Sequence, residues 1–230
     1  MGKIGGKQAE SSRVNDGDKT DEEKRADNER ARKLFAGACD FVAGATTPAV
    51  FPPATLPEIA FVGRSNAGKS SLVNALTGRS ALARVSHTPG RTRQINFFNL
   101  GARVMLVDLP GYGYAKASKA MTDEWNMLIT TYLRGRPSLR RVVLLVDSRR
   151  GIMASDEEVL GLLDQAAVST LVTLTKIDEL KPAALEAVIA ETAAKAAKHT
   201  AAYPEIFVTS SREKRGLEPL KVNLLLLAEA

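Results

Sequence analysis

The chain has 230 residues, of which 44% are hydrophobic, and this suits one medium-sized domain with an additional arm. Its single cysteine, Cys39, excludes an intramolecular disulfide and is interpreted as an inert thiol; with only His87 and His199 besides, no zinc site is expected. No apolar run reaches the roughly 20 residues of a membrane span, and the N-terminus lacks the apolar core of a signal peptide. We therefore expect a cytoplasmic protein without membrane association, whose net charge of +6 permits a polyanionic partner without requiring one.

Residues 1–33 contain almost no large apolar side chains and carry nine basic and eight acidic groups. Such a segment cannot bury enough apolar surface to offset the entropy of ordering, so a disordered N-terminal tail is predicted. Leu34 to Val42 could form a short helix, and the proline-rich stretch TTPAVFPPATLP (46–57) is typical of a connector. The predicted organisation is the tail, an N-terminal extension with its linker over 34–56, and one domain over 57–230.

From Pro57 onward, patterns typical of strands and of helices alternate. Apolar runs typical of buried strands occur at 58–63, 94–100, 103–109, 141–147, 169–176 and 205–210. Helical patterns lie at 69–78, 119–133, 155–167, 182–198 and 217–230. In the last of them leucine recurs on one helix face, at Leu217, Leu220, Leu224 and Leu227.

This alternation predicts an α/β fold of three layers, in which a mostly parallel, six-stranded sheet is covered by helices on both faces. The runs 94–100 and 103–109 are joined by a short Gly-containing turn and are typical of a hairpin. One antiparallel edge strand is therefore expected. The leucine face of the last helix predicts that it packs on the sheet.

The stretch FVGRSNAGKSSLVNAL (61–76) has the spacing G-x-x-x-x-G-K-S between a predicted strand and a predicted helix. A phosphate chain needs many donors within a tight radius, and backbone N–H groups supply them where Gly63 and Gly68 leave the approach open. The helix N-terminus adds positive partial charge. Lys69 can then reach the β- and γ-phosphates, and the Ser70 hydroxyl can ligate Mg²⁺. The segment predicts a phosphate loop, with a purely structural glycine-rich turn as the alternative.

Two further segments at predicted strand ends extend this site. In DLPG (108–111), Asp108 can hold Mg²⁺ through water, and the Gly111 N–H can sense the γ-phosphate. In TKID (175–178), Asp178 can accept from the N1–H and 2-amino groups of guanine, donors that adenine lacks.

The Lys176 stem can cover the plane of the base, and the segment TSS (209–211) can close over guanine with its backbone N–H groups. Each segment alone also fits a capped turn at a strand end. Because ligands of such sheets bind where the strands end, the ordered set predicts GTP rather than ATP.

These segments, together with TPGRTRQINFF (88–98) and DLPGYGYAKAS (108–118), resemble the EngB (YihA/YsxC) family of ribosome-biogenesis GTP-binding proteins, which are translation-factor-like P-loop GTPases. The resemblance runs from about Pro57 to the C-terminus. It implies the Ras-like form of the three-layer fold, binding of GTP or GDP with Mg²⁺, and a monomeric GTPase acting as a switch in assembly of the large ribosomal subunit. Members of the family are also linked to normal cell division and septation.

The resemblance places switch I, the loop that responds to the γ-phosphate, at GRSALARVSHTPGRTRQ (78–94), and switch II at 111–119. Thr92 would close on Mg²⁺ and the γ-phosphate, with Thr88 as the alternative. Catalytic roles are assigned to Lys69, Thr92 and Gly111, and Mg²⁺ ligation to Ser70, Thr92 and, through water, Asp108. The full set of predicted nucleotide contacts is Gly63, Arg64, Ser65, Asn66, Ala67, Gly68, Lys69, Ser70, Ser71, Gly90, Arg91, Thr92, Arg93, Gln94, Asp108, Leu109, Pro110, Gly111, Thr175, Lys176, Ile177, Asp178, Thr209, Ser210 and Ser211.

Tyr112 stands where many GTPases carry the glutamine that orients the attacking water, so slow intrinsic hydrolysis is expected. The missing group would come from a partner, another switch residue or a monovalent cation. Asn66 occupies the phosphate-loop position at which related potassium-dependent GTPases ligate K⁺, so K⁺ is a possible cofactor; an asparagine that merely caps the loop is the alternative.

Three functions remain open at this stage. The first is a GTP-switched factor for the large ribosomal subunit, with basic segments at 78–94, 134–141, 148–150 and 211–215 available for rRNA. The second is a nucleotide-binding scaffold in which hydrolysis is incidental. The third is an ATP-dependent kinase, which would need a lid and an acceptor site and would not need TKID.

Overall fold

The computed structural model describes residues 19–79, 82, 94–113 and 119–229. Its helices are α1 (Asp21–Ala36), α2 (Lys69–Thr77), α3 (Lys119–Gly135), α4 (Ala154–Gln165), α5 (Pro182–Ala196) and α6 (Leu217–Ala228), with short 3₁₀ helices at Pro48–Val50 and Ile177–Glu179. Its strands are β1 (Cys39–Ala45), β2 (Glu58–Gly63), β3 (Ile95–Leu100), β4 (Val104–Asp108), β5 (Leu139–Asp147), β6 (Thr170–Thr175) and β7 (Phe207–Val208).

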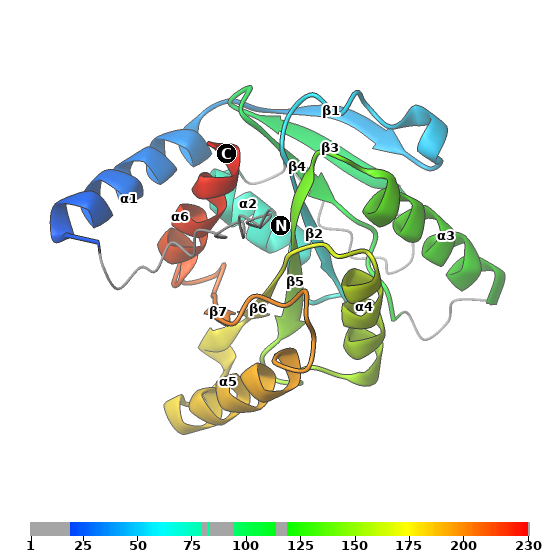
Figure 1. The fold of residues 1–230 in the computed structure, drawn as a ribbon. Coiled ribbons are helices and arrows are strands. Elements are labelled where there is room, and N and C mark those ends of the chain that lie inside the picture. Colours follow the sequence, from blue (N-terminus) through cyan, green and yellow to red (C-terminus); the bar gives the residue numbers. More distant parts are fainter. Residues whose placement is uncertain (1–18, 80–81, 83–93, 114–118, 230) are drawn as a thin grey trace, which may run out of the picture.

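These strands form one sheet in the order β1-β3-β4-β2-β5-β6-β7 (Figure 1). Parallel pairing joins β4, β2, β5, β6 and β7, and their apolar residues are buried on both faces, as continuous hydrophobic strands require. The parallel strands all end at one edge of the sheet. The loops that follow β2, β4, β5, β6 and β7 therefore gather at that edge.

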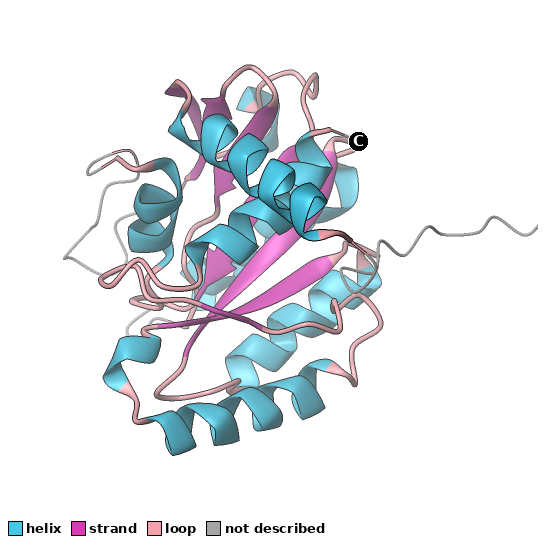
Figure 2. Ribbon diagram, turned by 90° about the vertical axis from the view of Figure 1, so that its left-hand side faces the viewer, coloured by secondary structure: helices cyan, strands magenta, loops and turns pink. Residues whose placement is uncertain are grey.

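Helices cover both faces of the sheet, as Figures 1 and 2 show. On one face, α1, α2 and α6 pack into a core that contains Phe35, Leu72 and Leu220. On the other, α3 and α4 pack into a second core that contains Ile129 and Leu163, and α5 adds its partly buried apolar residues. The predicted three-layer α/β fold is confirmed. The leucine face of α6 is also confirmed as a packing face, since Leu217, Leu220 and Leu224 are buried.

The sheet differs from the prediction in one strand. Seven strands are present in the described part of the chain rather than six, because β1 from the N-terminal extension joins the sheet. The antiparallel strand of the hairpin, β3, pairs with β4 on one side and with β1 on the other. It is therefore not the edge strand that the sequence predicted.

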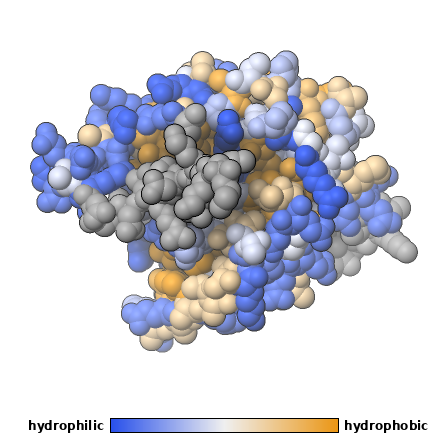
Figure 3. All heavy atoms as spheres, viewed as in Figure 1, coloured by the Kyte–Doolittle hydropathy of each residue, from blue (hydrophilic) through white to orange (hydrophobic). Residues whose placement is uncertain are grey.

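The N-terminal predictions need two corrections. Over Asp21 to Lys33 the chain is helical, not disordered: Thr20 and Glu23 form a capping box, and α1 continues to Ala36. Its buried apolar residues, Ala31 and Phe35, lie one turn apart on the side of the helix that packs beside α6. The outer side of α1 is hydrophilic (Figure 3), which is why composition concealed the helix. Residues 1–18 lie outside the described part.

The second correction concerns Leu34 to Val42, which does not form one helix. The chain leaves α1 at Gly37 and runs as β1 from Cys39. Cys39 is buried, and burial raises the pKa of its thiol to about 11, which agrees with an inert thiol.

Strand β1 holds the beginning of β3, the strand that follows predicted switch I. Ala45 pairs with Ile95 and Gly44 with Asn96, while the register shifts by a bulge between Phe41 and Ala43. A Cβ added at Gly44 would lie 2.7 Å from the Gln94 side-chain amide nitrogen, so the backbone of β1 lies directly against the Gln94 side chain. The N-terminal extension thus fixes the chain where switch I ends.

Candidate nucleotide site at the carboxyl edge of the sheet

The phosphate-loop segment forms the turn between β2 and α2. Gly68, at the N-cap of α2, has φ of 93°, and Asn66 has φ of 68°, so two residues use left-handed backbone to turn the chain. A Cβ at Gly63 would lie 2.8 Å from the Leu145 carbonyl oxygen, which leaves only glycine at the end of β2. The helix starts at Lys69 with its N-terminal N–H groups at the sheet edge.

The DLPG segment lies directly against this turn. Lys69 Nζ forms an ion pair with Asp108 Oδ1 at the end of β4, and Asp108 is 5% exposed. A Cβ on Gly111 would lie 3.3 Å from the Gly63 carbonyl oxygen and 3.4 Å from the Ser65 nitrogen, so the Gly111 backbone contacts the phosphate loop. The carboxylate of Asp108 and a serine hydroxyl are the hard oxygen donors that Mg²⁺ prefers.

The TKID segment is tied to the same loop by two side chains. The buried Thr175 hydroxyl donates to the Ala67 carbonyl oxygen at 2.6 Å, and Lys176 Nζ donates to the Asn66 carbonyl oxygen at 2.7 Å. Thr175 thus uses its hydroxyl, at the position where most GTPases have asparagine, to fix TKID on the phosphate loop. Lys176 has φ of 59°, which turns the backbone just before Asp178. A hydrogen bond from the Ser210 hydroxyl lowers the pKa of Asp178, so this side chain is a carboxylate at neutral pH.

The TSS segment completes the edge. The Ile177 N–H donates to the Thr209 carbonyl oxygen at 3.3 Å, and Ser210 and Arg215 exchange two backbone hydrogen bonds of 3.0 and 3.1 Å. Gly216 directly follows this turn as the N-cap of α6, with φ of 69°. The sequence predicted that these segments meet, and the structure brings 63–71, 108–111, 175–178 and 209–211 together.

Part of the predicted set lies elsewhere. Gly90, Arg91, Thr92 and Arg93 fall outside the described residues, as does the alternative Thr88. Gln94 is described, and its amide donates to Asn96 at 2.8 Å beside β1; its described contacts are with β1 and β3, not with the phosphate loop. The Leu109 side chain is buried in the core, so only its backbone faces the site.

Asp147, at the end of β5, was not identified from the sequence. Its Oδ2 accepts from Lys176 Nζ at 2.9 Å, and its two oxygens accept from the Arg149 guanidinium at 2.6 and 2.8 Å. Burial opposes the charge, yet these bonds hold the pKa of Asp147 below its ordinary value. An aspartate that ends a buried strand, as in LLVDSRR, is the signal that could have revealed it.

The sequence analysis noted only that Tyr112 replaces the glutamine of many GTPases. The structure shows in addition a hydrogen-bond partner for its hydroxyl. Its hydroxyl donates to Asp156 Oδ1 of α4 at 2.6 Å, and the residue is 8% exposed. Burial, then the charge of Asp156, raises the pKa of Tyr112. Burial also raises the pKa of Asp156. The phenol therefore keeps its proton, and it lies between Asp156 at the start of α4 and the Trp125 ring of α3.

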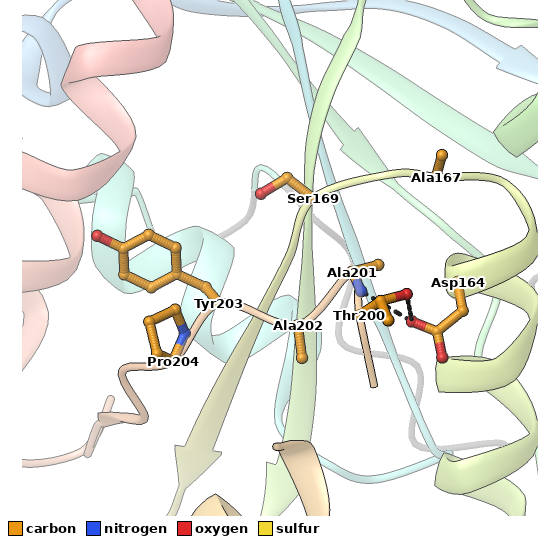
Figure 4. Close-up of a pocket in the computed structure, with 8 residues that line it drawn as sticks. All are labelled: Asp164, Ala167, Ser169, Thr200, Ala201, Ala202, Tyr203 and Pro204. Atoms are coloured by element: carbon orange, nitrogen blue, oxygen red, sulfur yellow. Dashed lines mark hydrogen bonds between the residues drawn. The ribbon is translucent and has the colours of Figure 1, made fainter. Parts of the chain in front are cut away.

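A pocket of about 410 Å³ lies at the other end of the sheet (Figure 4). Tyr203 and Pro204 line one side and Asp164 of α4 the other, with Ser169 just before β6. Asp164 is held by the Ala201 N–H at 2.8 Å. Because this pocket is at the amino end of β6, it is separate from the phosphate loop.

The fold has three layers, its first parallel strand ends in a phosphate-loop turn, and the TKID turn is hydrogen-bonded to that loop. This is the architecture of a P-loop GTPase. A sequence model of the family described as "50S ribosome-binding GTPase" matches residues 58–176. The probable GTP-binding protein EngB of Gluconobacter oxydans is 54% identical over 196 residues, covering 85% of this chain and 86% of the relative. That of Rhodospirillum rubrum is 52% identical over 205 residues, covering 87% and 89%.

The chain belongs to the EngB family of GTP-binding proteins, and it is a GTPase. A crystal structure of a probable GTP-binding protein EngB is similar over 75% of this chain and 98% of that one, with a TM-score of 0.60 and 25% identity. The GTPase Era, solved with MgGDPNP and a segment of 16S ribosomal RNA, is similar over 75% of this chain and 56% of that one, with a TM-score of 0.57 and 23% identity, which shows the shared fold.

Proposed function

We propose that this GTPase is a switch in assembly of the large ribosomal subunit, acting as a cytoplasmic monomer, and that its link to cell division and septation follows from that role. The observation that carries the proposal is the match to the ribosome-binding GTPase family over the segment that holds the phosphate loop, DLPG and the start of TKID. None of the described helices is long and apolar enough to cross a bilayer.

Within the site, the chain's own residues divide the work. The phosphate-loop backbone and Lys69 would bind the phosphates, Ser70 and, through water, Asp108 would hold Mg²⁺, and Asp178 would accept hydrogen bonds from guanine. Mg²⁺, when bound, neutralises charge on the β- and γ-phosphates. The role of closing switch I on the γ-phosphate is assigned to Thr92 by the family resemblance. The Lys69–Asp108 ion pair supports this assignment, because it holds the phosphate-binding cation and the metal-binding carboxylate side by side.

Hydrolysis should be slow without further help. Tyr112 has no amide, and its hydroxyl is buried and engaged with Asp156, so this residue cannot orient an attacking water as a glutamine would. This favours either an activator or the alternative function, a nucleotide-binding scaffold with incidental hydrolysis. Single-turnover hydrolysis measured with and without ribosomal subunits separates the two, because only a switch is expected to accelerate on its target.

Potassium is expected to be one activator. Asn66 is exposed on the phosphate loop, and a cation bound there would offset charge developing on the transferred phosphate. Exchanging Na⁺ for K⁺ should raise the single-turnover rate constant about tenfold or more, and Asn66→Ala should abolish the difference. Equal rates in the two salts for the unmodified protein would refute potassium activation and leave Asn66 as a loop cap.

The basic segments do not share one face. Segments 148–150 and 211–215 follow β5 and β7 and thus lie at the nucleotide edge, where Arg150 and Lys214 are exposed. Segment 134–141 precedes and begins β5 at the opposite end, and its Arg136 is engaged with Glu58 at 2.6 Å. An rRNA surface next to the nucleotide should therefore use the first two segments, with switch I, and not the third.

Binding to large subunits is expected to depend on the nucleotide and on the nucleotide edge. In co-sedimentation, the form with a GTP analogue should pellet with large subunits more tightly than the GDP form, and less at high salt. Arg150→Gln with Lys214→Gln should weaken this binding several-fold. The matched pair Arg134→Gln with Arg140→Gln removes the same charge at the opposite end and should change it little. Identical pelleting in both nucleotide states would count against the switch, and equal losses from the two pairs would count against this surface.

A further inference from the structure

Tyr112, which directly follows Gly111, is held from three sides. Its hydroxyl donates to Asp156 of α4 at 2.6 Å. Its ring meets the Trp125 ring of α3 at 5.7 Å between centroids in an edge-on arrangement. Its carbonyl oxygen accepts from the Ser65 N–H of the phosphate loop at 3.0 Å. Two helices and the phosphate loop thus fix the position of a single residue.

The Asp156 side chain, which accepts the Tyr112 hydrogen bond, is itself held in place. It is 1% exposed, and its second carboxylate oxygen accepts the Met153 N–H at 2.8 Å in the first turn of α4. Trp125 adds a further bond, because its indole N–H donates to the Pro110 carbonyl oxygen at 2.9 Å. The segment from Pro110 to Tyr112 is therefore fastened to α3 and α4 as well as to the sheet.

What this fastening holds in place is the backbone of Gly111. That backbone lies between Pro110 and Tyr112, both of which are tied down, and it contacts Gly63 and Ser65 of the phosphate loop. A backbone N–H is useful to a γ-phosphate only within a narrow range of distance and angle, since hydrogen bonds weaken steeply outside it. Removing a tie next to Gly111 should therefore affect contact with the γ-phosphate and spare the rest of the nucleotide.

We propose that Tyr112 is a positioning residue that, through its hydrogen bond to Asp156, holds the Gly111 N–H for the γ-phosphate and so sets the preference of this GTPase for GTP over GDP. The inference rests on the proposed role of Gly111 as the sensor of the γ-phosphate. Tyr112 itself touches no substrate. The phenol at this position serves recognition of the nucleotide state, where a glutamine would serve the attacking water.

The test is Tyr112→Phe, with dissociation constants for GDP and for a non-hydrolysable GTP analogue measured by calorimetry in Mg²⁺. The change removes one oxygen and keeps the ring on Trp125, so the fold should persist. Affinity for the analogue should fall about three- to tenfold, as expected for a misplaced hydrogen bond to a charged group. Affinity for GDP should stay within about twofold, because GDP has no γ-phosphate.

The chain supplies a matched control in Tyr132→Phe. Tyr132 is fully buried, and its hydroxyl donates to Glu58 Oε2 at 2.8 Å, the same kind of bond at the far end of β2. Both variants should lose similar stability against heat, but Tyr132→Phe should leave the ratio of the two dissociation constants unchanged. Asp156→Asn is the second test variant: with one oxygen left for Tyr112 and Met153 to share, it should shift the ratio in the same direction as Tyr112→Phe.

The possible results distinguish a failure of the proposed role of Tyr112 from a failure of the proposed nucleotide site. Unchanged ratios in Tyr112→Phe and Asp156→Asn, or a shift of equal size in Tyr132→Phe, overturn the role of Tyr112. An unmodified protein that binds GDP and the analogue equally also overturns it, since there is then no preference to set. Failure of the unmodified protein to prefer guanine over adenine nucleotides would instead refute the proposed nucleotide site.

Discussion

Replacing Asp178 with asparagine is expected to weaken GTP and GDP binding by about a hundredfold or more, since a site built to accept hydrogen bonds from guanine rejects its base when the acceptor is lost. Asp178 follows the left-handed turn at Lys176, and the Ser210 hydroxyl keeps it ionised. The amide of Asp178→Asn would place N–H groups where guanine also presents donors. Calorimetry with GDP, with and without Mg²⁺, measures the loss.

Xanthine nucleotides provide the internal control for this variant. Xanthine carries a 2-oxo group in place of the 2-amino group, so an amide donor can pair with it and affinity should be recovered. A variant that had merely unfolded would bind neither nucleotide. If the unmodified protein bound ATP as tightly as GTP, or if Asp178→Asn retained full GDP affinity, the assignment of TKID to guanine would be wrong.

Gly216→Ala should cause the largest loss of stability among single substitutions at the nucleotide edge. A Cβ at this position would lie 1.8 Å from the Val208 carbonyl oxygen, which belongs to the backbone of β7 and cannot swing aside, and φ is 69°. We expect the free energy of unfolding to fall by roughly 3 kcal/mol or more, and the melting temperature by about 10 °C for a chain of this size. Thermal unfolding followed by circular dichroism measures the shift.

Gly78→Ala is the matched control. Gly78 also has a left-handed φ, of 66°, at the end of α2, but a Cβ there would meet no atom of the described residues within 4 Å. Only the backbone strain remains, and it should cost about 1 kcal/mol. Equal losses in the two variants would show that the contact with Val208 relaxes and that strain alone decides. Because Gly216 directly follows the turn between Ser210 and Arg215, the Gly216→Ala protein should also bind guanine nucleotides less tightly.

The parts of the fold that the sequence predicted best are those with strong periodicity. The buried strands and the leucine face of α6 lie where apolar spacing placed them, because packing on a two-sided sheet demands that spacing. The N-terminal region could not be predicted by the same reasoning. The helix α1 has few apolar residues and a capping box within a charged segment. Strand β1 gains its conformation from pairing with β3, in which Cys39 pairs with Leu100 and Ala45 with Ile95, far along the chain.

The candidate site shows the same division. Glycine spacing and strand ends predicted which segments would meet, since parallel strands deliver their loops to one edge. The side-chain ties among them were beyond reach: Tyr112 to Asp156 and Lys176 to Asp147 join residues whose sequence separation carries no pattern. Such ties depend on how α4 and the loop after β5 come to rest against the sheet. Assignments in switch I, Thr92 above all, stay predictions.

Strand β1 also protects the protein from aggregation, because it covers the edge of β3. Without β1, the uncharged and mostly apolar strand INFFNL would be an edge strand with a free row of backbone donors and acceptors, and such an edge can pair with strands of other chains and lead to aggregation. With β1 in place, the new edge is interrupted by the bulge between Phe41 and Ala43, and a bulged edge is a poor template for another strand. A chain shortened from its N-terminus past Cys39 should therefore be prone to self-association. This is expected even though such a chain keeps every residue of the phosphate loop, DLPG, TKID and TSS.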